Sequence, residues 1–387
     1  MVKQADLLVV GAGILGTGHA LHALMKGYSV ILTEQDNAPQ EATVRNFGQA
    51  VSSGLTAGKW QQYGLDSLQL YKNIQAVFDL GIRNNGSYYI ASNADELQLI
   101  EELYAINQQN GYECHLLSKA DCLQRFAPLR EDYCLAALYF PLEVSIEPRI
   151  MIHRLLAYLQ LKYPDTFTYL PNTPIIGCSS ANGKAIAEST KGEQFQANKI
   201  IICSGREFRM LYPEIYRNSD LVVSKLQMMQ TFPMPEVSLP GNILTGLSIR
   251  RYESFEQCPS WSSKDNSVYD QKLFDNGIHI LFKQAIDGSI IIGDSHEYAP
   301  AAEIDRLGFD VNHEINDLIL EEAKRIINLP DWRIQRSWNG YYAQVKNGDL
   351  FHHHIDENIQ IVTGIGGKGM TSGLGLAGAN IKQTFAL

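Results

Sequence analysis

The hydrophobic positions near the start of the chain predict a strand, a turn, a helix and a second strand. Residues 6–10 form a short apolar run, and residues 28–33 form another that leads into the acidic Glu34. Short apolar, β-branched runs bounded by glycine are typical of buried parallel strands. The segment between them, which ends at Gly27, has the amphipathic pattern of a helix. We therefore expect a β-α-β unit over residues 6–34.

The same patterns predict further helices and strands along the rest of the chain. Apolar residues at helical spacing predict helices over residues 58–80, 95–109, 150–161, 312–328 and 372–385. Shorter apolar runs predict strands over residues 86–91, 135–140, 198–203, 222–231, 278–282, 289–293 and 359–363. The strands between residues 222 and 293 lie in a Pro- and aromatic-rich region, which favours an antiparallel sheet.

Together these elements predict an α/β (α+β) fold with two interleaved domains. A chain of 387 residues is long enough to bury two cores. We expect a Rossmann-like cofactor-binding domain over residues 1–85, 141–221 and 337–387. Residues 86–140 and 222–336 are expected to form a second, substrate-binding domain around a mainly antiparallel sheet.

The turn after the first strand carries the glycine pattern of a dinucleotide-binding site. Its three glycines permit a tight turn, a close approach to a pyrophosphate and close packing of helix on strand. The helix N-terminus offers N–H groups to the phosphates, and an acid at the end of the second strand accepts hydrogen bonds from a ribose. The predicted contacts in this unit are Gly11, Gly13, Ile14, Leu15, Gly16, Glu34 and Gln35.

Two further segments are candidates for the cofactor site. A polar loop after Glu34 contains Arg45, Asn46, Phe47 and Gly48, which we place beneath the cofactor, although a surface loop with a solvated arginine is the plainer interpretation. The strand at residues 198–203 leads to Gly205, as expected for a strand that returns to the parallel sheet.

The glycine-rich segment from residue 364 onward is the second informative stretch. Seven of the fifteen residues from 364 to 378 are glycine, a density that fits backbone packed against a flat ligand. A second helix N-terminus there would stabilise the negative charge of a reduced flavin, which favours FAD over NAD; an NAD-dependent dehydrogenase stays the competing hypothesis. The predicted contacts are Gly366, Gly367, Lys368, Gly369, Met370 and Thr371.

Composition narrows the possible partners and compartment. The formal net charge is −10, with no local basic cluster, so we expect no nucleic-acid partner. No apolar run approaches the roughly 18 residues of a membrane helix. The six cysteines have no metal-ligand spacing, which predicts reduced thiols in a cytoplasmic protein. His352, His353 and His354 are adjacent and would alternate faces on a strand, so we predict no metal site.

These motifs together resemble the D-amino-acid oxidase superfamily, in particular its glycine oxidase and sarcosine oxidase branch. The resemblance covers the full length, and it includes the fingerprint with Glu34, the loop at residues 45–48, Trp338-Asn339-Gly340 and residues 364–371. Within that branch, segments such as residues 225–229, 251–255 and 293–298 resemble a subgroup of FAD-dependent oxidoreductases associated with phosphonate catabolism, which acts on 2-aminoethylphosphonate and its N-methyl derivatives.

The resemblance implies oxidation of a C–N bond in a small anionic amine. A hydride passes from the carbon beside a neutral amine to flavin N5, and dioxygen or another electron acceptor then reoxidises the flavin. Oxidases of α-amino acids in this family commonly place an arginine just after the Trp-x-Gly turn to bind the carboxylate. Here the turn is followed by Tyr341 and Tyr342, so ordinary α-amino acids fit less well.

Other residues must then hold the anionic group of the substrate. The predicted substrate-side residues are Lys368, Arg336, His296 and Tyr342, with Arg45 as a further cation. Arg336 is equally well explained as a surface ion-pair partner, and His296 as a partner of Asp294 or Glu297. Lys225 and Lys283 are candidates for oxygen activation, but solvated or core-edge lysines are the expected interpretation. Glycine, sarcosine or D-amino-acid oxidation stays open, as does a flavin-binding subunit that needs a partner protein.

Overall fold

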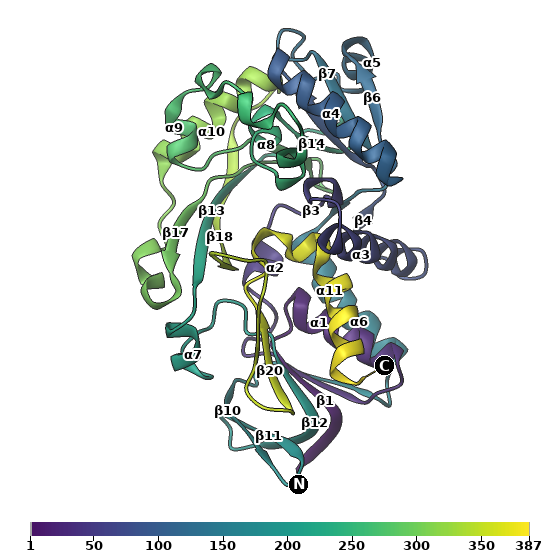
Figure 1. Cartoon of the computed structure of the whole chain (residues 1–387), viewed down its shortest axis with the longest axis vertical. Coiled ribbons are helices and arrows are strands. Elements are labelled where there is room, and N and C mark those ends of the chain that lie inside the picture. Colours follow the sequence, from purple (N-terminus) through teal and green to yellow (C-terminus); the bar gives the residue numbers. More distant parts are fainter. Residues whose placement is uncertain (1, 387) are drawn as a thin grey trace.

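Two large sheets organise the computed structural model, which describes residues 2–386. Met1 and Leu387, at the ends of the predicted first domain, lie outside the described residues. The first sheet has the order β10-β11-β12-β1-β2-β9, and β20 joins β12 and carries β19. Its strands are β1 (Lys3–Val10), β2 (Val30–Thr33), β9 (Phe167–Leu170), β10 (Ile175–Ala181), β11 (Lys184–Ser189), β12 (Gln194–Ile202), β19 (Phe351–His354) and β20 (Ile359–Thr363). Figure 1 shows it in the lower half of the molecule.

The centre of the first sheet is parallel, as the sequence predicts. β1 pairs in parallel with β2 on one side and with β12 on the other, and β12 pairs in parallel with β20. All four residues of β2 are buried, which explains their unbroken apolar pattern. The three-histidine run lies on β19, which among the described residues pairs with β20 alone, as expected for an edge strand.

The second sheet is mainly antiparallel and has the order β17-β13-β16-β15-β14-β5-β7-β6, with β18 also paired to β13. Its strands are β5 (Ser87–Ala91), β6 (His115–Ser118), β7 (Ala136–Phe140), β13 (Leu221–Thr231), β14 (Asn242–Leu244), β15 (Leu281–Gln284), β16 (Ile290–Gly293), β17 (Glu297–Pro300) and β18 (Ile334–Val345). β18 runs across the predicted domain boundary at residues 336 and 337, so the domain division stays a prediction. A small third sheet contains β3 (Gln49–Ala50), β4 (Ile82–Arg83) and β8 (Val144–Ile146).

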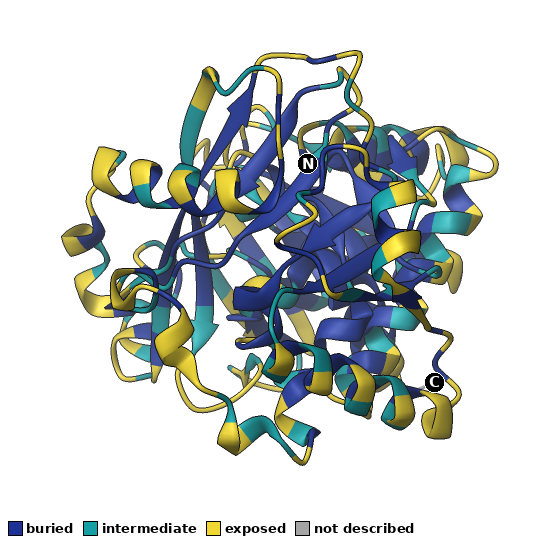
Figure 2. Cartoon of the chain, turned by 90° about the horizontal axis from the view of Figure 1, so that it is seen from above, coloured by how far each residue is buried: buried dark blue, intermediate teal, exposed yellow. Residues whose placement is uncertain are grey.

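The helices cover the outer faces of the sheets. They are α1 (Ile14–Met25), α2 (Ala42–Arg45), α3 (Lys59–Gln75), α4 (Ala94–Asn110), α5 (Lys119–Arg125), α6 (Pro148–Lys162), α7 (Pro213–Arg217), α8 (Gly246–Ile249), α9 (Gln271–Asp275), α10 (His313–Ile326) and α11 (Gly369–Thr384). In Figure 2 the outer helices alternate between buried and exposed residues, whereas the strands inside are buried. This alternation is the amphipathic pattern seen in the sequence.

Helix α11 packs against α1 and α3 through its glycines. A Cβ on Gly375 would lie 2.2 Å from the carbonyl oxygen of Tyr63 on α3, and one on Gly378 would lie 2.6 Å from the His22 ring on α1. The glycine density that we ascribed to ligand contact therefore also serves helix packing. The helix begins at Gly369, three residues before the predicted start.

Helix α4 is tied to Arg250, the residue that follows α8, by a buried ion pair. Arg250 Nε lies 2.8 Å from Glu96 Oε1, and the side chains are 1% and 0% exposed. The Glu96 carboxylate also accepts hydrogen bonds from Ser92, Asn93 and Tyr269. A buried charge of this kind needs such compensation.

The cysteines and the helices agree with two further predictions. All six cysteines are free thiols, and five are buried. Within residues 2–386, no helix combines the length and the apolar character that crossing a membrane requires.

Candidate functional site

A cavity of about 540 Å³ lies between the two sheets. One end is formed by the turn before α1, the loop at residues 46–48 and residues 364–371. The other end is formed by two residues that follow α8, Arg251 and Tyr252, and by four side chains around β15, β16 and β17. These four are His279, Asp294, His296 and Tyr298. Leu226, Leu281 and Tyr342 of the second sheet line the middle. We call this space the main cavity.

The glycine turn has the geometry that the fingerprint predicts. Gly11 has φ of +96°, and a Cβ there would lie 2.5 Å from the Cys203 carbonyl oxygen. A Cβ on Gly16 would lie 1.8 Å from the Gly11 carbonyl oxygen, so neither position accepts a side chain. Gly13 is the N-cap of α1 and supplies no side-chain cap, which leaves the helix N-terminus facing the cavity. Ile14 N donates to Thr43 Oγ1 at 2.9 Å.

A narrower cavity of about 130 Å³ extends from the same turn along the end of β2. It is lined by Glu34, Gln35 and Arg206, and it shares Gly13 and Gly205 with the main cavity. Glu34 accepts hydrogen bonds from Ala12 N at 2.9 Å and Asp36 N at 3.1 Å, and burial raises its pKa. The two cavities together give an elongated site that fits a dinucleotide.

The glycine-rich segment leaves open space where a flat ligand can lie. A Cβ added to Gly367 or Gly205 would have no atom within 4 Å. Gly366 has φ of +63°, a left-handed backbone conformation that favours glycine. Met370 and Thr371 also have structural roles: the Met370 carbonyl accepts from Tyr71 Oη at 2.9 Å, and Thr371 Oγ1 accepts from Val51 N at 3.2 Å. The residues present therefore fit the flavin end of FAD.

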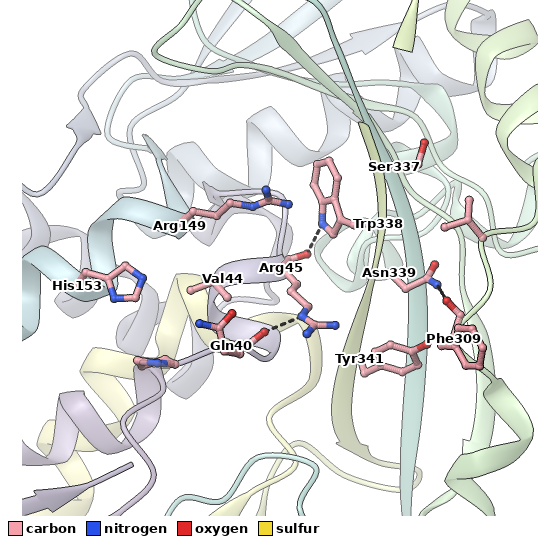
Figure 3. Close-up of a pocket in the computed structure, with 12 residues that line it drawn as sticks. Gln40, Val44, Arg45, Arg149, His153, Phe309, Ser337, Trp338, Asn339 and Tyr341 are labelled. Atoms are coloured by element: carbon pink, nitrogen blue, oxygen red, sulfur yellow. Dashed lines mark hydrogen bonds between the residues drawn. The ribbon is translucent and has the colours of Figure 1, made fainter. Parts of the chain in front are cut away.

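The loop at residues 45–48 is divided between two cavities. Asn46, Phe47 and Gly48 line the main cavity, and Asn46 Oδ1 accepts from Gly48 N at 2.9 Å. Arg45 instead lines another cavity and donates to the Gln40 carbonyl (Figure 3). Arg45 therefore lies outside the lining of the main cavity, and its place at the cofactor stays a prediction.

Two predicted cations are not free in the main cavity. Lys368 lines it, but its ammonium pairs with Asp349 and with Glu253 at 3.5 Å. Arg336 is exposed on β18 and does not line the main cavity. Its only hydrogen bond among residues 2–386 is a long one, 3.4 Å, to Gln335. The interpretation of Arg336 as a substrate contact is not supported by its position.

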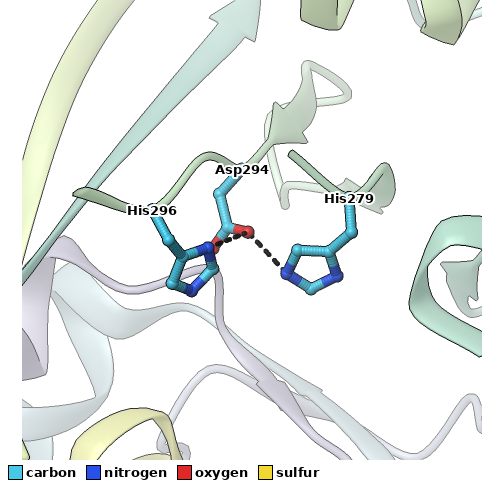
Figure 4. A group of neighbouring side chains, drawn as sticks. All are labelled: His279, Asp294 and His296. Atoms are coloured by element: carbon cyan, nitrogen blue, oxygen red, sulfur yellow. Dashed lines mark ion pairs between the residues drawn. The ribbon is translucent and has the colours of Figure 1, made fainter. Parts of the chain in front are cut away.

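His296 lies in a buried group with Asp294 and His279 (Figure 4). Asp294 Oδ1 is 2.7 Å from His279 Nε2 and 3.8 Å from His296 Nδ1. His296 Nδ1 also lies 3.1 Å from the Gly277 carbonyl oxygen. A carbonyl can only accept, so Nδ1 carries the proton and Nε2 keeps the lone pair. The ligand atoms of the group lie within 4.8 Å of one another, a composition that also suits a metal.

The environment fixes the protonation states in this group. Burial lowers the pKa of His296 to about 3, so the imidazole is neutral. Burial raises the pKa of Asp294, but its interactions with His279 and Arg251 outweigh this effect and the net pKa is lowered, so the carboxylate is anionic. Burial raises the pKa of Tyr342 well above its usual value, which keeps its hydroxyl protonated. The substrate end therefore offers one buried negative charge.

Sequence reasoning missed several residues here. Arg251 donates to the Tyr298 hydroxyl at 3.1 Å, and no carboxylate among residues 2–386 lies within 4.0 Å of it. The available signal was its place as the first residue of the segment 251–255, which resembles the subgroup. His279 had none, since it reaches Asp294 only through the pairing around β15 and β16.

The two lysines considered for oxygen activation are buried, not solvated. Lys283 donates to the Ile146 carbonyl and lies 3.6 Å from Glu147 Oε2. A Cβ on Gly48 would lie 2.6 Å from its Nζ, so it packs directly behind the cavity wall. Lys225 donates to the Leu307 carbonyl at 2.9 Å and pairs with Glu297 at 3.4 Å.

Comparison with known proteins agrees with this geometry. Residues 6–380 match the DAO family, described as FAD dependent oxidoreductase. The chain is 20% identical to glycine oxidase of Bacillus licheniformis over 375 residues, which cover 95% of this chain and 88% of that protein.

Solved structures give the same fold. Glycine oxidase from Bacillus cereus ATCC 14579 superposes with a TM-score of 0.78 at 16% identity, covering 99% of this chain and 95% of that one. L-alpha-glycerophosphate oxidase from Mycoplasma pneumoniae, solved with FAD bound, has a TM-score of 0.75 at 16% identity, covering 99% and 95%.

The fold, the fingerprint and the family match agree with one another. The predicted fold class is confirmed, as is FAD in preference to NAD. The match begins at the first strand and continues into α11, so it spans both ends of the elongated site. The chain therefore belongs to the DAO family of FAD dependent oxidoreductases.

Proposed function

We propose that this oxidoreductase oxidises the C–N bond of a small amine that carries an anionic group at its other end. The best candidate substrate is 2-aminoethylphosphonate or one of its N-methyl derivatives. Glycine or sarcosine is the second candidate, favoured by the similarity to glycine oxidase. When bound, FAD supplies the acceptor for the hydride that leaves the carbon beside nitrogen.

The distribution of charge at the substrate end of the main cavity supports this proposal. Asp294 is a buried anion that can hold an ammonium group, and neutral His296 has a lone pair at Nε2 that can accept an N–H hydrogen bond. Arg251, a cation at the same end, has no carboxylate within 4.0 Å among residues 2–386. A molecule with an amine at one end and an anionic group at the other can contact both.

Tyr342 supports the preference for a phosphonate over an α-carboxylate. It occupies the position after the Trp-x-Gly turn where the resembled oxidases hold a carboxylate with arginine. In this chain the buried, protonated Tyr342 can donate one hydrogen bond but brings no charge. The anionic group must then bind farther from the amine, towards Arg251, and a longer molecule reaches both groups better than an α-amino acid does.

The residues also account for the proton that the amine must lose. Asp294 holds the incoming ammonium, water accepts the proton that it loses, and His296 Nε2, which burial keeps unprotonated, accepts a hydrogen bond from the neutral amine. Leu226, Leu281 and Tyr342 form an apolar wall that excludes water from the reacting carbon. The six unpaired cysteines support the cytoplasm as the proposed location.

An anaerobic titration of the flavin spectrum tests the proposal. Sarcosine, glycine, 2-aminoethylphosphonate and its N-methyl derivative are added in turn to the FAD-loaded protein. Bleaching by a phosphonate alone supports the proposal. Bleaching by glycine or sarcosine alone refutes the phosphonate assignment, and no bleaching by any amine points to a subunit that needs a partner protein.

Two variants locate the charges. Arg251→Gln should raise KM for the anionic amine by about tenfold, with a smaller change in kcat, because a charged hydrogen bond contributes about 1.5–3 kcal/mol. Asp294→Asn should lower kcat/KM and shift its pH profile, since the amine loses its counter-charge. Arg333→Gln, at an exposed arginine paired with Asp331, is the matched control. Equal KM values for the Arg251 and Arg333 variants would refute the role of Arg251.

A further inference from the structure

A third cavity, of about 500 Å³, lies beside α2. Arg45 from α2, Arg149 and His153 from α6 and Trp338 from β18 line it, and we call it the arginine pocket (Figure 3). None of these residues lines the main cavity. The arginine pocket is therefore distinct from the main cavity, although α2 contributes to the walls of both, and it shares Pro39, Gln40 and Tyr341 with the narrower cavity.

The arginine pocket carries positive charge that the chain does not neutralise. Arg45 has one carboxylate nearby, Glu41 at 4.0 Å, and that carboxylate already accepts two hydrogen bonds from Arg206 at 2.8 and 3.0 Å. Among residues 2–386, no carboxylate lies within 4.0 Å of Arg149 or His153. Such a concentration of cations is unexpected in a chain with a net charge of −10.

The cations also lie close enough to repel one another. Partial burial, and then the charges of Arg336 and Arg45, hold the pKa of Arg149 below its usual value. Arg149 and His153 are four residues apart on α6, so they share one face of that helix. An anion between these groups would remove the repulsion, and nothing in the described residues does so.

The arginine pocket is held in shape by its aromatic wall. The Trp338 indole N–H donates to the Arg45 carbonyl at 3.0 Å, which fixes the ring. The Arg149 guanidinium lies 4.9 Å from the centre of the same ring, so it is oriented by a cation–π contact. The guanidinium groups are thus partly preorganised before any ligand arrives.

We propose that the arginine pocket binds a small phosphate or phosphonate dianion. Guanidinium forks match the oxygens of these groups in pairs, and a tetrahedral group has enough oxygens to contact more than one arginine. A carboxylate has two oxygens and one charge, so it satisfies a single fork. The occupant is either inorganic phosphate or an organic phosphonate, and the affinity for each distinguishes them.

Isothermal titration calorimetry on the FAD-loaded protein tests the proposal, with inorganic phosphate, methylphosphonate and acetate as probes. The wild type should bind one or both dianions and should bind acetate much more weakly. Arg149→Gln should weaken dianion binding by about tenfold or more, because a charged hydrogen bond contributes about 1.5–3 kcal/mol. The double variant Arg149→Gln/Arg45→Gln should abolish it, because both arginines line the pocket. If only one of these two dianions binds, that result shows whether the ligand is a phosphate or a phosphonate.

Matched variants separate the arginine pocket from the main cavity. Arg333→Gln changes the net charge by the same amount and should leave the affinity unchanged. Arg251→Gln should also leave it unchanged, because Arg251 lines the main cavity. The proposal is overturned if the wild type binds neither dianion, if acetate binds as tightly, or if Arg251→Gln abolishes binding while Arg149→Gln does not. The last result would leave the proposed enzymatic function intact.

Discussion

Replacing Gly375 with alanine should separate α11 from α3 and weaken the flavin end of the site. A Cβ at residue 375 would lie 2.2 Å from the Tyr63 carbonyl oxygen, whereas ordinary contacts begin at 3.4 Å. The obstacle is backbone, so no rotamer change relieves it. The helices must move apart by roughly 1 Å, which is the difference between these two distances.

The structure lets the cost of that movement be estimated. The shortest hydrogen bonds between the helices run from Tyr71 Oη to the Met370 carbonyl at 2.9 Å and from Gly375 N to Ser67 Oγ at 2.8 Å. Both would lengthen beyond hydrogen-bond range, at about 1 kcal/mol each. Overpacking adds about 1–3 kcal/mol, and alanine returns about 1 kcal/mol through its higher helix propensity. The net destabilisation is about 2–4 kcal/mol.

Calorimetry of the FAD-loaded and FAD-free protein measures this effect. At about 2–4 °C per kcal/mol, Tm should fall by on the order of 10 °C, and FAD should dissociate more readily because α11 begins at the cavity. Gly177→Ala is the matched control, since a Cβ there meets no atom within 4 Å. If Gly375→Ala keeps the Tm of the control, the helices have room to adjust and the packing argument is refuted.

Two further predictions concern buried charges. Glu96→Gln should lower the free energy of unfolding by about 3–5 kcal/mol, because buried Arg250 then keeps only the partly exposed Asp95, 3.7 Å away, as a charged partner. Urea unfolding measures this loss, with exposed Asp305→Asn as a control, and equal losses in the two variants would contradict the prediction. Burial lowers the pKa of Lys283 to about 8, so above pH 8 the unfolded chain retains a proton that the folded chain releases. Lys283 should therefore make the free energy of unfolding rise between about pH 8 and 10, by at most about 1.4 kcal/mol per pH unit. Below pH 8 it should have no pH-dependent effect on the free energy of unfolding. Lys283→Met should remove this rise, and parallel wild-type and variant curves would refute it.

The parts of the site that depend on neighbours in sequence could be predicted from the sequence. Gly16 must be glycine because of Gly11, only five residues earlier. The sequence predicts the strand at residues 359–363 with its observed bounds, because four of its five residues are β-branched and all five are buried. The spacing of residues that are close in the sequence determines such local geometry, so the fold class and the cofactor could be predicted from that spacing.

The parts that depend on distant partners could not be predicted. Lys368 was placed at the flavin, but Glu253 and Asp349 attract its ammonium, and no sequence pattern joins these three residues. His279 and Asp294 are fifteen positions apart and meet because their backbones exchange two hydrogen bonds, of 3.0 and 2.8 Å. Side-chain direction and long-range pairing, not residue type, decide which groups share a site.

The segments that line the elongated site come from positions far apart in the chain, and this affects how the protein matures. Gly11 and Gly366 both line the elongated site, yet 355 positions separate them. At about 5–20 residues per second, a ribosome needs roughly 20–70 s to synthesise the intervening chain. Throughout that interval the fingerprint exists without β20 and α11, which complete the flavin half. FAD capture is therefore a late event in the synthesis of this protein, and the early-made β-α-β unit must stay folded, or protected, without its ligand.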